Sequence, residues 1–183
     1  MIELDTARLR LRQWREEDLQ PFARLNADAE VMEFFPARLS RESSDGVARR
    51  LRDKIAERGW GLWAVEERAS GEFIGFVGLQ PPAAQLPFSP CIEVGWRLAR
   101  AFWGRGYATE GARAALRAGF ETLGLDEIVS FTALGNRRSR AVMERIGMLE
   151  DPAGAFDHPS VPEGSPVRAH CLYRLGRERW TRL

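Results

Sequence analysis

The order of hydrophobic and polar residues predicts alternating stretches of strand and helix. Leu9 and Leu11 alternate with arginines, and this period of two is typical of a half-buried strand. Val47, Leu51 and Ile55 recur every four residues, which places one apolar stripe on a helix. The same criteria predict strands over 8–12, 61–67, 72–80, 91–99, 127–133, 148–150 and 167–175. They predict helices over 16–25, 43–58, 107–123 and 137–146.

The order of these elements predicts one α/β domain, of the α+β type, over residues 1–183. A short turn joins the runs 61–67 and 72–80, so we expect them to pair antiparallel, with 91–99 in the same group. Strand and helix do not alternate regularly along the chain. We therefore expect a mixed, largely antiparallel sheet of seven strands, flanked by about four helices.

Composition and charge exclude several classes of partner. The formal net charge is +1 and no long run of like charge occurs, so we expect no nucleic-acid partner. The N-terminus lacks the apolar run of a signal peptide and no stretch reaches transmembrane length, so we expect a cytoplasmic protein with no membrane partner. Cys91 and Cys171 are far apart, and with His158 and His170 they make no zinc-ligand spacing. We expect no metal.

The stretch 92–111 joins an apolar strand to a helix through a loop that contains Gly104 and Gly106. The first N–H groups of a helix lack internal acceptors and carry partial positive charge, so an anion can bind there. Glycine lets a ligand approach the backbone and tolerates positive φ. No lysine follows for a nucleoside-triphosphate loop, and Thr109 stands where a dinucleotide fingerprint needs glycine or alanine. The stretch predicts a phosphate loop of another kind.

Several motifs resemble the GNAT N-acetyltransferases, and among them the branch of RimJ/RimL-like ribosomal-protein N-acetyltransferases. Residues 103–108, Trp-Gly-Arg-Gly-Tyr-Ala, are similar to the Gln/Arg-x-x-Gly-x-Gly/Ala pyrophosphate loop of that family. Trp103 departs from the pattern, but the departure leaves the backbone donors of the loop unchanged. The other matching segments are Thr6–Arg12, Glu93–Trp96, Ala108–Glu110 and Asn136-x-x-Ser139 ahead of Gly147-Met148.

The resemblance implies direct transfer of an acetyl group from acetyl-coenzyme A to a primary amine, without an acyl-enzyme. The implied acceptor is the α-amine of a protein N-terminus or a small-molecule amine, and the protein is expected to be a monomer or a homodimer. A domain that binds acyl-coenzyme A as a sensor, without turnover, is the alternative. The residues implied to bind coenzyme A are Trp96, Arg97, Leu98, Gly104, Arg105, Gly106, Tyr107, Ala108, Thr109, Asn136 and Ser139.

Glu93 and Ser139 are the catalytic candidates. Glu93 lies in an otherwise apolar strand, where desolvation would raise its pKa toward the range of a general base. A pair with Arg97 on the same face of the strand is the structural alternative. The resemblance implies that Ser139 lies near the sulfur, and the alternative is a hydrogen bond to its own helix. Asn136 is predicted to cap that helix.

A long connection over 152–166, rich in proline and glycine, is expected to lack regular structure and to be functional. The residues expected near the acceptor are Phe34, Phe35, Trp63, His158 and Glu163. Core packing is the alternative for the aromatic residues, and exposure to solvent for the two loop residues. His170 and Tyr173 are further candidates for proton transfer, on opposite faces of the last strand, with packing as the alternative.

Overall fold

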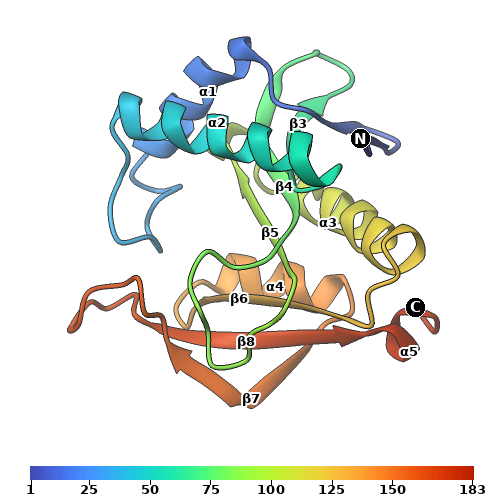
Figure 1. Cartoon of the computed structure of the whole chain (residues 1–183). Helices are drawn as coiled ribbons and strands as arrows, with labels where there is room; N and C mark the ends of the chain where they lie inside the picture. The colour runs from blue at the N-terminus through green and yellow to red at the C-terminus, as the bar shows by residue number, and fades with distance from the viewer.

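Eight strands form a single mixed sheet in the computed structural model, which describes residues 1–183 (Figure 1). The strands lie in the order β1-β2-β3-β4-β5-β6-β8-β7, and all neighbours are antiparallel except β5 and β6. The mixed, largely antiparallel sheet is confirmed, with one strand more than predicted. The strands are β1 (Leu4–Asp5), β2 (Leu9–Arg12), β3 (Leu62–Glu67), β4 (Phe73–Gln80), β5 (Glu93–Leu98), β6 (Glu127–Ala133), β7 (Leu149–Asp157) and β8 (Ala169–Gly176).

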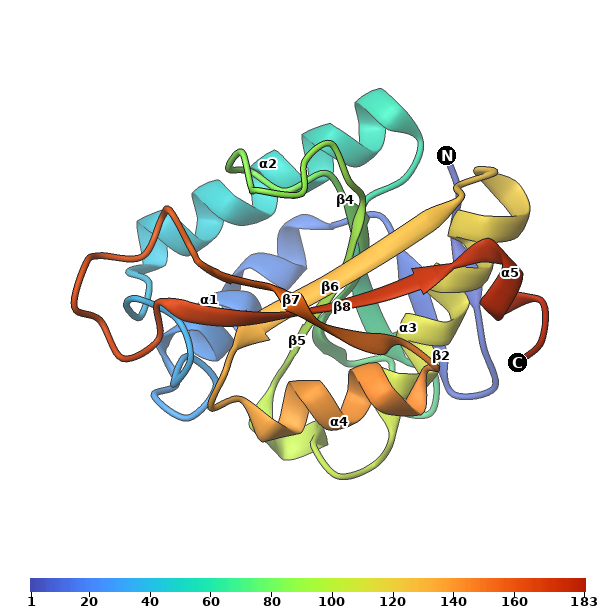
Figure 2. The same cartoon turned by 90° about the horizontal axis from the view of Figure 1, so that it is seen from below.

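Helices cover both faces of the sheet. They are α1 (Leu19–Ala27), α2 (Arg41–Arg58), α3 (Tyr107–Arg117), α4 (Arg137–Arg145) and α5 (Arg177–Trp180). Neighbouring residues of β4 show which helix lies on which face, because Phe76 packs against Phe22 of α1 while Val77 lies against Gly111 of α3. Figure 2 shows α1 and α2 on one side of the strands, with α3 and α4 on the other. None of these helices combines the length and the apolar composition needed to cross a bilayer.

The predicted helix ends are set by local hydrogen bonds. Ser40 caps α2 by accepting the N–H of Ser43, and Gly59 ends that helix in the left-handed conformation. Asn136 caps α4, as predicted, by accepting the N–H of Ser139. The helix predicted over 107–123 is α3 followed by one π-helical turn over 118–122.

The connection predicted over 152–166 differs from the structure. β7 continues through Pro152 to Asp157, with an irregularity in its pairing between Asp151 and Phe156. β7 is the edge strand, where proline is tolerated because no neighbour needs its missing N–H. The prediction of a strand confined to 148–150 was therefore wrong.

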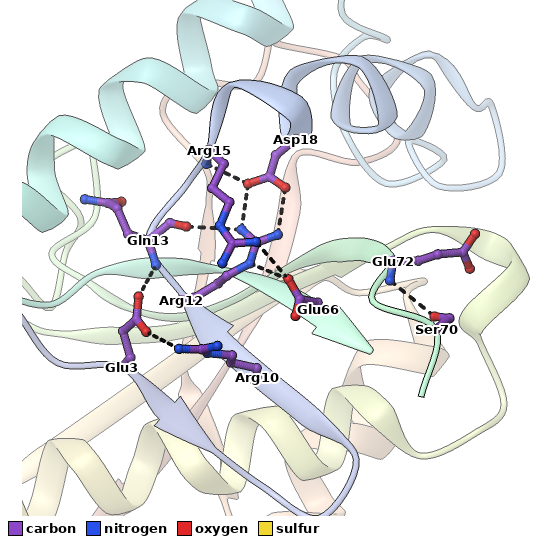
Figure 3. A network of polar contacts seen from close by, with 9 residues as sticks. All are labelled: Glu3, Arg10, Arg12, Gln13, Arg15, Asp18, Glu66, Ser70 and Glu72. Carbon is purple, nitrogen blue, oxygen red and sulfur yellow. Dashed lines mark hydrogen bonds and ion pairs between the residues drawn. The ribbon is translucent and has the colours of Figure 1, made fainter. Parts of the chain in front are cut away.

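Buried charges fix β2 to the elements beside it (Figure 3). Two nitrogens of Arg12 donate to the carboxylate of Asp18 at 2.8 and 2.9 Å, and its Nε donates to Glu66 of β3 at 2.8 Å. Arg12 and Asp18 are only 3% and 1% exposed. The Asp18 carboxylate also accepts the backbone N–H of Arg15, so this network sets how the chain enters α1.

β5 and β6 separate soon after they meet. They share one residue pair, Glu93 with Val129, where the N–H of Val129 donates to the carbonyl of Ile92 at 2.9 Å. One residue later the hydroxyl of Ser130 bridges to the carbonyl of Val94 at 2.9 Å. Beyond this bridge the two strands have no further pairs, and a wedge opens in the middle of the sheet.

Candidate active site

A cavity of about 1020 Å³ occupies the wedge between β5 and β6. Its walls come from β5, from β6 with His170 of β8, from the loop before α3, and from α4. The segment 28–40 between α1 and α2 reaches across to α4. There Phe34 lies against Gly135, and Glu33 forms an ion pair with Arg138 at 2.8 Å. Segments from both halves of the chain therefore enclose the cavity.

The loop before α3 offers a row of free backbone donors to this cavity. Gly104 and Gly106 adopt φ values of +74° and +80°, a conformation that favours glycine. No backbone or side-chain group of the protein accepts the N–H groups of residues 104–109, and no side chain caps α3. These donors at a helix start fit the two phosphates of a diphosphate group. The loop is therefore suited to hold a diphosphate group, and the resemblance to the GNAT family implies that of coenzyme A.

The segments Thr6–Arg12 and Ala108–Glu110, which resemble the family separately, contact each other here and hold the loop in place. Glu110, in the first turn of α3, accepts the hydroxyl of Thr6 at 2.6 Å and the N–H of Arg8 at 2.9 Å. The guanidinium of Arg8 pairs with Glu110 and donates to the carbonyl of Arg105 at 2.9 Å. These contacts of Glu110 with Thr6 and Arg8 could not be predicted from the motifs taken one at a time. The only local feature that could have indicated them is the acidic residue in the first turn of α3.

Trp103, at the position where the family pattern has Gln or Arg, contacts the elements on either side of the loop. Its indole N–H donates to the carbonyl of Leu98 at 2.8 Å. The guanidinium of Arg138 lies over the ring at 4.4 Å, in a cation–π contact. Trp103 therefore connects the end of β5 to the first turn of α4.

The backbone of β5 presents two further donors to the wedge. The N–H of Ala99 donates to the carbonyl of Ile74 in β4. Backbone N–H groups of successive residues point to opposite sides of a strand, so those of Trp96 and Leu98 point away from β4 and into the wedge. Arg97 differs from these two residues, because its backbone turns toward β4 while its side chain lines the cavity. The register with β4 is continuous over six pairs, so β5 has no bulge on that side.

Glu93 is half-buried at the closed end of the wedge. Burial raises the pKa of Glu93 to about 7, and a hydrogen bond from Nε2 of Gln80 at 2.6 Å acts in the opposite direction. The expected alternative, a pair with Arg97, is wrong, because Arg97 donates to Asn26 of α1 instead. A carboxylate with this pKa can accept a proton near neutral pH.

Ser139 lies in the first turn of α4, where Asn136 controls its orientation. The side-chain amide of Asn136 donates to the hydroxyl oxygens of Ser139 and Thr132 at 3.1 and 2.9 Å. Since the Ser139 oxygen accepts this bond, its own hydrogen is available to a group in the cavity. Asn136 thus has a structural role at both the helix end and the cavity wall.

Two histidines form part of the cavity wall opposite β5. The rings of His158 and His170 are 5.0 Å apart, among the side chains of Phe131 and Phe156. Burial lowers the pKa of both imidazoles, and the neighbouring His170 lowers that of His158 further. Nδ1 of His170 lies 2.9 Å from the carbonyl of Arg168, so this nitrogen carries the proton and Nε2 is free to accept one.

Comparison with known proteins places this architecture in a family. A family model described as an acetyltransferase (GNAT) domain matches residues 8–149. The chain belongs to the GNAT acetyltransferase family. It is an acetyltransferase, and the resemblance seen in its motifs is confirmed.

Relatives of this GNAT chain include a named acetyltransferase and solved structures. An Aspergillus fumigatus protein named FsC-acetyl coenzyme A-N(2)-transacetylase is 36% identical over 98% of this chain and 78% of its own length. An acetyltransferase crystal structure from Agrobacterium tumefaciens has a TM-score of 0.75 and 31% identity, covering 96% of this chain and 94% of its own. A RimL ribosomal L7/L12 α-N-protein acetyltransferase, solved with coenzyme A, shares the fold, with a TM-score of 0.74 and 16% identity over 96% and 98% of the chains.

The GNAT cavity brings together most of the residues that the sequence singled out. Those that line it are Phe34, Phe35, Glu93, Trp96, Arg97, Leu98, Gly104, Gly106, Tyr107, Ala108, Thr109, Asn136, Ser139, His158 and His170. Arg105 contributes backbone only, because its exposed side chain turns toward Glu67 at 3.8 Å. No group of three His, Cys, Asp or Glu side chains is placed to hold a metal ion.

Three of the expected residues lie away from the cavity. Trp63 is wholly buried in the core and donates to the carbonyl of Ile2 at 2.8 Å, so its assignment to the acceptor was wrong. Glu163 is exposed and does not reach the cavity wall. Tyr173 is buried against α4, where its hydroxyl bonds to Arg140 and Glu144, so packing rather than proton transfer accounts for it.

Proposed function

We propose that this acetyltransferase moves the acetyl group of acetyl-coenzyme A directly to a primary amine. The observation that carries this is the shared cavity, which presents free backbone donors at one end and a carboxylate with raised pKa at the other. The A. fumigatus relative is named for transfer from acetyl-coenzyme A to an N(2) nitrogen, which supports an amine acceptor. The acceptor is a small-molecule amine or the α-amine of a protein N-terminus.

The donor end of the cavity would hold coenzyme A along its length. The N–H groups of residues 104–109 would bind the pyrophosphate at the start of α3. The N–H groups of Trp96 and Leu98 would bond to the pantetheine arm, which would take the place of a strand beside β5. Asn136 and Ser139 would contact the arm from α4.

The chemistry follows from three groups of this chain. Acetyl-coenzyme A supplies an activated acetyl group as its thioester. Glu93 would accept the proton that the acceptor loses, a lighter task for an α-amine with a pKa of about 8 than for a lysine near 10.4. A backbone donor of β5 would stabilise the oxyanion, and one such donor is worth about 3 kcal/mol. The Ser139 hydroxyl would donate to the leaving thiolate as the C–S bond breaks.

A thiol-release assay tests this proposal. The protein is mixed with acetyl-coenzyme A and a panel of small amines and N-terminal peptides, and free thiol is measured over time. We expect release that depends on at least one amine, with the acetylated amine detected by mass spectrometry. Binding of acetyl-coenzyme A without amine-dependent release would instead identify a sensor domain.

A further inference from the structure

Arg97 brings a positive charge into the cavity on the face of β5 that is turned toward α1. It pairs in register with Phe76, and its guanidinium lies 4.0 Å from the ring centre of Phe35 and 5.4 Å from that of Phe76. Nη1 donates to the side-chain oxygen of Asn26 at 2.6 Å. Asn26 is wholly buried and is itself held by Ser44 at 2.8 Å. The guanidinium is therefore held in place by groups from α1, from β4 and from the segment 28–40.

The other nitrogens of this guanidinium have no hydrogen-bond partner in the protein. Nε is buried and has no hydrogen-bond acceptor, and no carboxylate lies within ion-pair distance. Glu93, the acidic residue on the same face of β5, is bonded to Gln80. Burial lowers the pKa of Arg97 to about 10, which still leaves it charged at neutral pH. A buried charge without a counterion lowers the stability of the folded protein, so this site favours the binding of an anion.

We propose that Arg97 binds a carboxylate of the acceptor, and that the acceptor is a small-molecule amine that carries this carboxylate. Nη2 of Arg97 makes no hydrogen bond in the protein and, unlike Nε, is not buried, so it can donate a charge-assisted hydrogen bond to a carboxylate oxygen. The aromatic rings on Arg97 shield this contact from water and strengthen it. The inference rests on the proposed function, because it takes this face of the cavity as the acceptor site.

The spacing on β5 sets where the two ends of the acceptor lie. Glu93 and Arg97 are four residues apart on one strand face, or about 13 Å at roughly 3.3 Å per residue. Their side chains shorten the gap by reaching into the same cavity. The amine and the carboxylate are therefore separated by several bonds, as in an ω-amino acid.

Matched pairs of acceptors test the inference. Each ω-amino acid of a series graded in length is compared with its own carboxamide in the thiol-release assay. With the wild-type protein we expect kcat/KM to be about 10- to 100-fold higher for the carboxylates, as for hydrogen bonds to charged groups. Arg97→Gln should remove this preference by slowing the carboxylates alone, and Arg97→Lys should restore part of it. Arg24→Gln, at an exposed arginine of α1 without an ion pair, is the matched control.

The assay separates a wrong role for Arg97 from a wrong reaction. Equal kcat/KM for carboxylates and carboxamides would overturn the role of Arg97 and leave amine acetylation intact. The absence of thiol release with every amine would overturn the proposed function and this inference with it. If Arg97→Gln does not fold, simple carboxylates that lack an amine are tested as inhibitors of the wild-type protein. We expect competition with the acceptor, whereas competition with acetyl-coenzyme A would place Arg97 in the donor site and overturn the inference.

Discussion

At the scale of single residues, Glu93 connects a local environment to the pH dependence of the reaction. Its pKa is raised to about 7 by burial, so the carboxylate is protonated in acid and ionised above neutrality. A general base acts in its ionised form, so kcat/KM should fall below about pH 7 and level off above it. Glu93→Gln should lower kcat by about 10²- to 10⁴-fold and leave the affinity for coenzyme A unchanged, as steady-state kinetics and calorimetry would show.

Gln80 provides a control for this assignment. Its hydrogen bond lowers the pKa of Glu93, so Gln80→Leu should move the acid limb of the kcat/KM profile to higher pH. The plateau at high pH should keep most of its height, since the base is ionised there in both proteins. A wild-type rate for Glu93→Gln, or an acid limb that Gln80→Leu leaves in place, would remove Glu93 as the base.

The sequence predicted single residues well where the cause was local. The apolar neighbours of Glu93 were sufficient to predict its raised pKa, and Asn136 could be assigned as a cap from its position before a helix. The surroundings of Arg97 could not be predicted, because Asn26 and Phe35 come from a distant part of the chain. Trp63 was misassigned because alternation along a strand does not show which face is enclosed by helices.

At the scale of elements, the loop before α3 makes a direct prediction about binding. Gly106 adopts a positive φ that a larger residue strains to reach, and a carboxylate there would repel a diphosphate. Gly106→Asp should therefore abolish the binding of coenzyme A in calorimetry. Gly124→Asp, at a similar φ of +72° with open space around it, should retain binding. Unchanged affinity in Gly106→Asp would contradict the assignment of the loop.

The buried ion pairs of β2 predict a large effect on stability. Arg12→Met leaves the Asp18 carboxylate buried without its partner, which should lower the free energy of unfolding by about 3–5 kcal/mol. The same change at Arg10, whose pair with Glu3 is exposed, should cost about 0–1 kcal/mol (Figure 3). Urea denaturation would measure both. Equal losses in the two variants would show that burial is not what makes the Arg12 network important.

Among the elements, long periodic segments could be predicted and short or edge segments could not. The stripe of Leu51 and Ile55 was sufficient to predict α2. β1 and α5 span two and four residues, too few for a period to show. The length of β7 depends on its position at the sheet edge, which cannot be predicted from the local sequence.

At the scale of the whole molecule, the wedge is the feature that brings the site together. It exists because parallel β5 and β6 share one residue pair before they diverge. The pairing joins strands whose residues lie more than thirty positions apart, so hydrophobic periodicity alone carries no sign of it. The structure therefore shows what the sequence could not, namely that the N–H groups of Trp96 and Leu98 are left free where the strands diverge.

Hydrogen–deuterium exchange with and without coenzyme A tests whether coenzyme A lies in the wedge with its pyrophosphate on the loop before α3. The amides of Trp96, Leu98 and residues 104–109 have no acceptor in the protein, so they should exchange quickly in the free state. Saturating coenzyme A should slow exchange in peptides covering 94–99 and 103–110 and leave peptides of α2 unchanged. Unchanged exchange in these two peptides, with protection elsewhere or nowhere, would contradict the account.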